Sequence, residues 1–117
     1  MGLMTAFTER QFGGPIPQRP VNWRGRSGRF YALVPERLET FALTTEGLHM
    51  LARGSVPMWV GSAHDVIHDA QSRARFRLAL AAADRAFLVE ASADELRRMT
   101  TVWDLEGAEP VSGLSAA

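Results

Sequence analysis

The chain has 117 residues, enough for one domain with a modest hydrophobic core. Hydrophobic residues make up 46% of the chain and charged residues 22%, which is typical of a globular protein. Thirteen basic residues balance thirteen acidic ones and cysteine is absent, so composition excludes disulfide scaffolds, thiolate metal sites and cysteine nucleophiles, and the overall charge favours neither a nucleic-acid nor a membrane binder.

Two further features of the composition bear on where the protein works. No run approaches the roughly 18 apolar residues of a membrane-spanning helix, and the N-terminus lacks the charged start and apolar stretch of a signal peptide. Lysine is absent, so arginine supplies all the basic residues counted above, and alanine is abundant, as in GC-rich bacterial coding sequences. We therefore predict a bacterial protein of the cytoplasm with no membrane contact.

The charges divide unevenly along the chain and single out its N-terminal segment. Residues 1–29 carry five arginines and one glutamate (net +4), whereas the remainder carries eight arginines and twelve acids (net −4). Glycines and prolines interrupt any helix or strand period there, so residues 1–28 are predicted to form an irregular basic arm. Apolar residues such as Phe12 and Trp23 predict that the arm docks on its own domain or on a partner.

Short runs of β-branched and aromatic residues follow the arm. They predict strands at residues 30–34, 40–44, 47–51 and 56–61, and the turn residues between them favour a small antiparallel meander. The run 47–51 also fits a single helical turn. A further strand is predicted at residues 86–90.

A helical segment is predicted between the last two of these strands. Ser62 and Asp65 have the spacing of a capping box, which predicts a helix from about residue 63, and Asp69 offers a second start. The segment up to residue 83 is rich in alanine, leucine and arginine and lacks glycine and proline. Its predicted core stripe consists of Phe76, Ala79, Leu80 and Ala83.

A second amphipathic helix is predicted near the C-terminus. Ser92 and Glu95 form another capping-box pattern, and Gly107 is a plausible C-cap. Leu96, Met99 and Trp103 follow at i, i+3 and i+7, so we expect them to pack in the core.

Together these elements predict an α+β fold. We expect a small mixed or antiparallel sheet of four to five strands with two helices on one face. The predicted organisation is an irregular basic arm over residues 1–28, a single α+β domain over residues 29–107 and a disordered tail over residues 108–117.

One candidate metal site lies at the start of the first helix. His64 and His68 are four positions apart, so on a helix they point the same way and can share a metal ion. The string from His64 to Asp69 also resembles the H-E-x-x-H metalloprotease pattern, with Asp65 in the position of the base. The alternative interpretation is a polar first turn whose acids favour the helix N-terminus.

The second candidate site is the arm itself. Arginines interleaved with aromatic residues and glycines can pair with phosphates and stack on bases. The residues assigned to this candidate binding surface are Arg19, Trp23, Arg24, Arg26 and Arg29. An arm of charge +4 beside a body of charge −4 is first expected to dock on its own domain, with Trp23 as the anchor, and a protein partner or a nucleic acid are the alternatives.

The third candidate rests on a family resemblance. The segment Trp59-Val60-Gly61-Ser62-Ala63-His64-Asp65, with the earlier strand Phe30-Tyr31-Ala32-Leu33, resembles the core of the GIY-YIG nucleases. In that family a first strand ends in a tyrosine, and a second reads Tyr-Ile-Gly or a variant. A helix with a catalytic arginine and a later glutamate that holds a divalent metal ion follow.

The resemblance implies roles for particular residues. Tyr31 would be the first tyrosine, Arg73 or Arg75 the catalytic arginine, and Glu90 or Glu95 the metal ligand. Trp59 stands where the family usually has a tyrosine, and the interval between the two strands is longer than the family's hairpin. These departures favour a degenerate, non-cleaving relative.

No complete set of catalytic groups emerges from the sequence, whereas a basic and aromatic arm does. We therefore predict a non-catalytic binding or accessory module without a cofactor, whose arm contacts a partner protein or a second copy of the chain. Deleting residues 1–28 should then leave the fold intact. The alternative is a GIY-YIG-like, metal-dependent nuclease or a degenerate nucleic-acid-binding relative.

Overall fold

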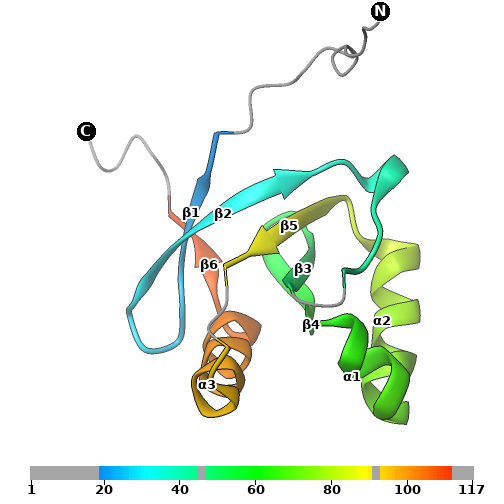
Figure 1. Cartoon of the computed structure of the whole chain (residues 1–117). Coiled ribbons are helices and arrows are strands. Elements are labelled where there is room, and N and C mark those ends of the chain that lie inside the picture. Colours follow the sequence, from blue (N-terminus) through cyan, green and yellow to red (C-terminus); the bar gives the residue numbers. More distant parts are fainter. Residues whose placement is uncertain (1–18, 45–46, 91–92, 112–117) are drawn as a thin grey trace, which may run out of the picture.

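The computed structural model describes residues 19–44, 47–90 and 93–111 (Figure 1). These residues form a curled antiparallel sheet with three α-helices, so the predicted α+β class is confirmed. The strands are β1 (Val21–Arg24), β2 (Phe30–Glu36), β3 (Leu48–Arg53), β4 (Val56–Gly61), β5 (Arg85–Val89) and β6 (Glu109–Pro110). The helices are α1 (Ala63–His68), α2 (Ala70–Ala82), α3 (Glu95–Glu106) and a short 3-10 helix, η2 (Leu38–Thr40).

The sheet has six strands in the order β4-β3-β5-β2-β1-β6. Strand β5 lies between the two hairpins β1–β2 and β3–β4, so the predicted meander is wrong. The reason lies in the side chains of β5: Phe87 and Val89 are buried on one face and Ala86 on the other. A strand that is apolar on both faces is stable at the centre of a sheet, where neighbours cover it on both edges.

Two of the six strands lie in segments that were predicted to be irregular or disordered. Residues 21–24 of the arm pair with β2, with Trp23 opposite Tyr31, and Glu109 of the predicted tail pairs with Arg24. The predicted strand at 40–44 is absent. Phe41 and Leu43 instead lie in a loop and pack with Leu51 and Trp59, on the other face of the sheet from Trp23. Residues 1–18 and 112–117 lie outside the described part.

The main core fills the inside of the curl. Trp23 is fully buried there and meets the ring of Phe87 edge to face, with 5.6 Å between ring centroids. Other large members of this core are Leu33, Leu48, Met50, Val89 and, from α3, Leu105. Because Trp23 supplies the largest of these side chains, the arm is part of the domain's core.

Helices α2 and α3 cover opposite faces of the sheet, not one face as predicted. On β3, Met50 belongs to the core that Leu105 of α3 joins, and the next residue, Leu51, belongs to a second core with Ala79 of α2. Neighbouring residues on a strand point to opposite faces. Leu51 and Trp59 of β4 are therefore covered by α2, with Trp59 edge-on to Phe76 at 4.8 Å.

The first helical segment divides in two at Asp69, as the second start signal allowed. Asp69 has extended backbone angles and caps α2 by accepting hydrogen bonds from the backbone N–H groups of Gln71 and Ser72. The predicted capping box of Ser62 and Asp65 is confirmed at the start of α1.

Candidate functional site

The described part of the arm docks on α3 through a buried carboxylate. Asp104 of α3 accepts hydrogen bonds from the backbone N–H and the hydroxyl of Ser27, both at 2.8 Å, and from the hydroxyl of Tyr31 at 2.7 Å. Asp104 is only 2% exposed to solvent. The predicted docking of the arm on its own domain is thereby confirmed for the described residues.

The hydrogen bonds at Asp104 also set the protonation of the cluster. Burial alone would raise the pKa of Asp104, but the bonds from Ser27 and Tyr31 and the charge of Arg29 outweigh it and lower the pKa below its usual value. Burial and the bond to this carboxylate raise the pKa of Tyr31 to about 12. At neutral pH Tyr31 is therefore a neutral donor that holds Asp104.

The arginines of the arm have different surroundings. Arg24 forms an ion pair with Glu109 across β1 and β6. Arg26 donates from Nε to the carbonyl oxygen of Trp103 at 2.8 Å, and its guanidinium carbon lies 5.1 Å from the centre of that ring. Arg19 is exposed.

Trp23, which the sequence placed on the binding surface, is not available to a partner. Trp23 is 0% exposed to solvent, because it lies in the core inside the curled sheet and packs against Phe87. The interpretation of Trp23 as a contact residue is wrong, and its role as the anchor of the docked arm is confirmed.

The outer side of α3 carries three large apolar side chains that are more than half exposed. Leu96, Met99 and Trp103 are 71%, 57% and 52% exposed, so their prediction as core residues is wrong. The buried side of α3 is instead formed by Leu105 and Asp104. We call Leu96, Met99 and Trp103 the α3 crest.

Charges of opposite sign flank the crest at its C-terminal end. Glu106 lines a hollow of about 300 Å³ beside Met99 and Trp103. Arg26 lies against Trp103 from the side of Asp104. Because successive helix residues are turned by about 100°, Glu106 and Asp104 fall on opposite sides of Trp103.

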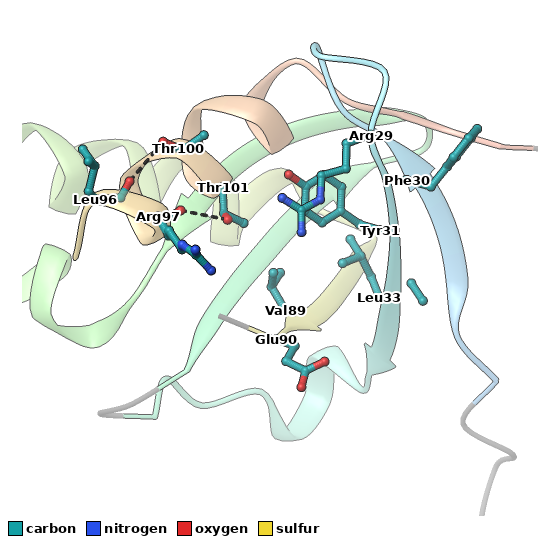
Figure 2. Close-up of a pocket in the computed structure, with 11 residues that line it drawn as sticks. Arg29, Phe30, Tyr31, Leu33, Val89, Glu90, Leu96, Arg97, Thr100 and Thr101 are labelled. Atoms are coloured by element: carbon teal, nitrogen blue, oxygen red, sulfur yellow. Dashed lines mark hydrogen bonds between the residues drawn. The ribbon is translucent and has the colours of Figure 1, made fainter. Parts of the chain in front are cut away.

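A pocket of about 520 Å³ opens on the other side of α3, between that helix, β2 and the end of β5 (Figure 2). Arg29 and Tyr31 line it at the start of β2, Glu90 follows β5, and Arg97 comes from the first turns of α3. Two residues of the nuclease alternative, Tyr31 and Glu90, are thus brought to one pocket. No sequence signal pointed to Arg97.

The other residues of that alternative lie elsewhere. Trp59 is buried and donates its ring N–H to the hydroxyl of Ser72 at 3.0 Å. Arg73 donates to the carbonyl oxygens of Val66 and Ile67 at 2.8 and 3.2 Å, which holds the end of α1 against α2. Arg75 and Glu95 line the hollow beside the crest.

The two histidines do lie together. The rings of His64 and His68 have centroids 4.3 Å apart, while Asp65 is used in the capping box with Ser62. Across residues 19–44, 47–90 and 93–111 no third histidine or acid joins them in a group that could hold a metal ion. Metal binding by this pair stays a prediction.

Comparison with protein-family models, with curated proteins and with solved structures gives no match for this chain. Among the helices of the described residues, none has the length and apolar character needed to cross a membrane.

Proposed function

We propose that this protein is a non-catalytic binding module that acts through protein–protein contacts, as the sequence analysis suggested. The observation that supports this most is the α3 crest, where Leu96, Met99 and Trp103 are each more than half exposed. Large apolar side chains gathered on one helix face mark interaction surfaces, and aromatic residues and methionine are enriched at interface centres. The contact surface therefore moves from the arm as a whole to the crest and Arg26, which stacks on Trp103.

The occupant that best fits the crest is a second copy of the chain. Arg26 flanks Trp103 on one side and Glu106 flanks it on the other. If two α3 helices pack crest to crest in parallel around a two-fold axis, each acidic side meets the basic side of its partner at the same level. Antiparallel packing would place the charged residues of the two copies at opposite ends of the paired helices, where they do not meet. Complementary edges of this kind set partner and orientation in paired helices.

Placing a charge on the crest should break the association. We expect Met99→Glu to raise the dissociation constant of the dimer by at least about tenfold, because a buried unpaired carboxylate at an interface costs more than about 1.4 kcal/mol. Leu78→Glu is the matched control, since Leu78 of α2 is 71% exposed and lies outside the crest. Sedimentation velocity over a range of protein concentrations measures the dissociation constants of the wild type and of both variants.

A wild-type chain that stays monomeric at every concentration would contradict the second copy as occupant. Equal weakening by Met99→Glu and Leu78→Glu would contradict the crest as the contact surface.

The nuclease alternative retains one supporting observation, the shared pocket of Tyr31 and Glu90. It requires magnesium-dependent nicking of plasmid DNA that both Tyr31→Phe and Glu90→Gln abolish. Our proposal expects no nicking above that of a mock preparation. Nicking lost in both variants would replace the binding module with the enzyme.

Nucleic acid binding and the cellular location remain predictions within this proposal. Arg24 and Arg26 are engaged with Glu109 and Trp103, which leaves fewer cations of the arm for phosphates than the sequence suggested. A gel shift at low salt tests the first prediction, and fractionation of bacterial cells tests the cytoplasmic location.

A further inference from the structure

Two arginines from separate elements extend into the pocket between β2 and α3. Figure 2 shows the side chain of Arg29 reaching in from the start of β2 and that of Arg97 reaching in from α3. The volume of about 520 Å³ falls within the range of small-molecule sites in proteins.

The guanidinium groups of both residues have hydrogen-bond donors to spare. Arg29 forms no ion pair and its guanidinium no hydrogen bond with any residue of the described chain; its guanidinium carbon lies 5.3 Å from the centre of the Tyr31 ring. Arg97 approaches the carboxylate of Asp94 only to 3.8 Å and its side chain is 79% exposed, which is too far for a hydrogen bond. Each guanidinium carries five N–H donors in a fork that fits a carboxylate or a phosphate.

The hydroxyl groups of the pocket are committed elsewhere. Thr100 and Thr101 donate to the carbonyl oxygens of Leu96 and Arg97, both at 3.0 Å, and Tyr31 donates to Asp104. The side-chain donors left for a ligand are therefore the two guanidinium groups, so the part of a ligand that binds them must be an acceptor.

The acids near the pocket neutralise this pair only in part: Asp94 lies 3.8 Å from Arg97, and Asp104 feels the charge of Arg29. Asp104 faces Tyr31 and Ser27, which supply its hydrogen bonds. Glu90 lines the pocket, but Figure 2 shows its carboxylate beyond Val89, at the far end from Arg29. The end of the pocket beside Arg29 and Arg97 is the cationic one.

The apolar surface that a ligand can reach lies on α3. Leu33 and Val89 line the pocket but are only 1% exposed, whereas Leu96, which also lines it, is 71% exposed. An inorganic ion would leave this surface in water, whereas an organic ligand would cover it.

From these contacts we infer that the pocket binds a small organic anion. Its carboxylate or phosphate group lies between Arg29 and Arg97, and its apolar body lies against Leu96. The site shares Leu96 with the crest but does not include Met99 or Trp103, so Arg29→Ala tests ligand binding and Met99→Glu tests self-association independently.

The test is an NMR titration of the full chain with three probes at constant ionic strength: benzoate, phenyl phosphate and inorganic phosphate. We expect benzoate or phenyl phosphate to saturate with a dissociation constant near or below about 1 mM, and inorganic phosphate to bind at least about tenfold more weakly because it lacks the apolar body. The better of the two aromatic probes identifies the anionic group as carboxylate or phosphate.

Variants locate the site. Arg29→Ala and Arg97→Ala should each weaken the better probe by about tenfold or more, since each removes a charge-assisted hydrogen bond. Arg77→Ala is the matched control, because Arg77 is an exposed arginine of α2 outside the pocket. Thermal melts of all three variants show whether each remains folded.

Each contrary outcome overturns the inference. No saturation by either aromatic probe up to about 10 mM, a weaker affinity than any specific site would give, removes the site. Equal weakening by Arg77→Ala shows nonspecific attraction to positive charge. Inorganic phosphate binding as tightly as phenyl phosphate shows that the apolar lining is not used.

Discussion

Replacing Asp104 with alanine is expected to lower the free energy of unfolding by about 3 kcal/mol. The change leaves the backbone N–H of Ser27 and the hydroxyl of Tyr31 without their acceptor, and each unsatisfied buried polar group costs about 1–3 kcal/mol. Glu106→Ala is the control, because Glu106 is an exposed acid on the same helix, and a change within about 0.5 kcal/mol is expected there. Urea unfolding followed by circular dichroism measures both.

The acid dependence of stability gives the Asp104 experiment a second readout. The pKa of Asp104 is lowered in the folded protein, so its contribution is present above the unfolded value of about 3.9 and is lost as pH falls through the folded value. Unfolding free energy should fall less steeply below about pH 4 in Asp104→Asn than in the wild type. Parallel curves for the two proteins would contradict the role of the carboxylate.

Tyr31 sets the alkaline side of the same profile. Its pKa rises from 10.0 to about 12 on folding, so the stability that depends on its proton is present below pH 10 and is lost as pH rises towards about 12. In Tyr31→Phe the free energy of unfolding should no longer fall over this alkaline interval. A wild-type profile that is flat over this interval would contradict the buried bond to Asp104.

Deleting residues 1–28 is expected to unfold the domain, contrary to the expectation from sequence. The deletion removes β1 and Trp23, the largest fully buried side chain. Loss of that side chain alone, in Trp23→Ala, should cost about 3–5 kcal/mol, a large part of the total stability of a small domain. Thermal unfolding followed by circular dichroism should therefore show no cooperative transition for the deleted chain.

The matched control is deletion of residues 1–18, which removes none of the contacts described for β1. We expect that shorter deletion to melt within a few degrees of the full chain, since a few degrees corresponds to about 1 kcal/mol or less. A cooperative, wild-type-like melt after deletion of residues 1–28 would show that β1 is dispensable.

Local signals predicted the elements whose causes are local. The capping box of Ser62 and Asp65 and the C-cap at Gly107 involve neighbours in the chain, and both are confirmed. The strand at residues 56–61 also follows from its own side chains.

The orientation of α3 could not be predicted in this way. Leu96, Met99 and Trp103 have the spacing of a core stripe, yet the helix turns Asp104 and Leu105 inward. Asp104 is buried because Ser27 and Tyr31, more than seventy positions away, supply its hydrogen bonds. Periodicity predicts that a helix has an apolar face. It cannot predict that residues distant in sequence will bury the opposite, polar face of the helix.

The candidate site was predicted only in part for the same reason. Tyr31 and Glu90 were chosen from a resemblance and do share a pocket, but Arg73 turns to the carbonyl groups at the end of α1. Arg97 has no distinguishing sequence context, and its place opposite Arg29 depends on how α3 packs.

The pairing of β1 with β6 has a consequence for how the protein is made. Figure 1 shows these strands side by side, and Arg24 and Glu109, which join them, are 85 positions apart. During synthesis on the ribosome, β1 therefore emerges long before its partner strand β6. Trp23 likewise emerges long before Leu105, which belongs to the same core. Contacts this distant in sequence form slowly and leave apolar surface open meanwhile. A growing chain that lacks α3 and β6 therefore leaves the core around Trp23 incomplete.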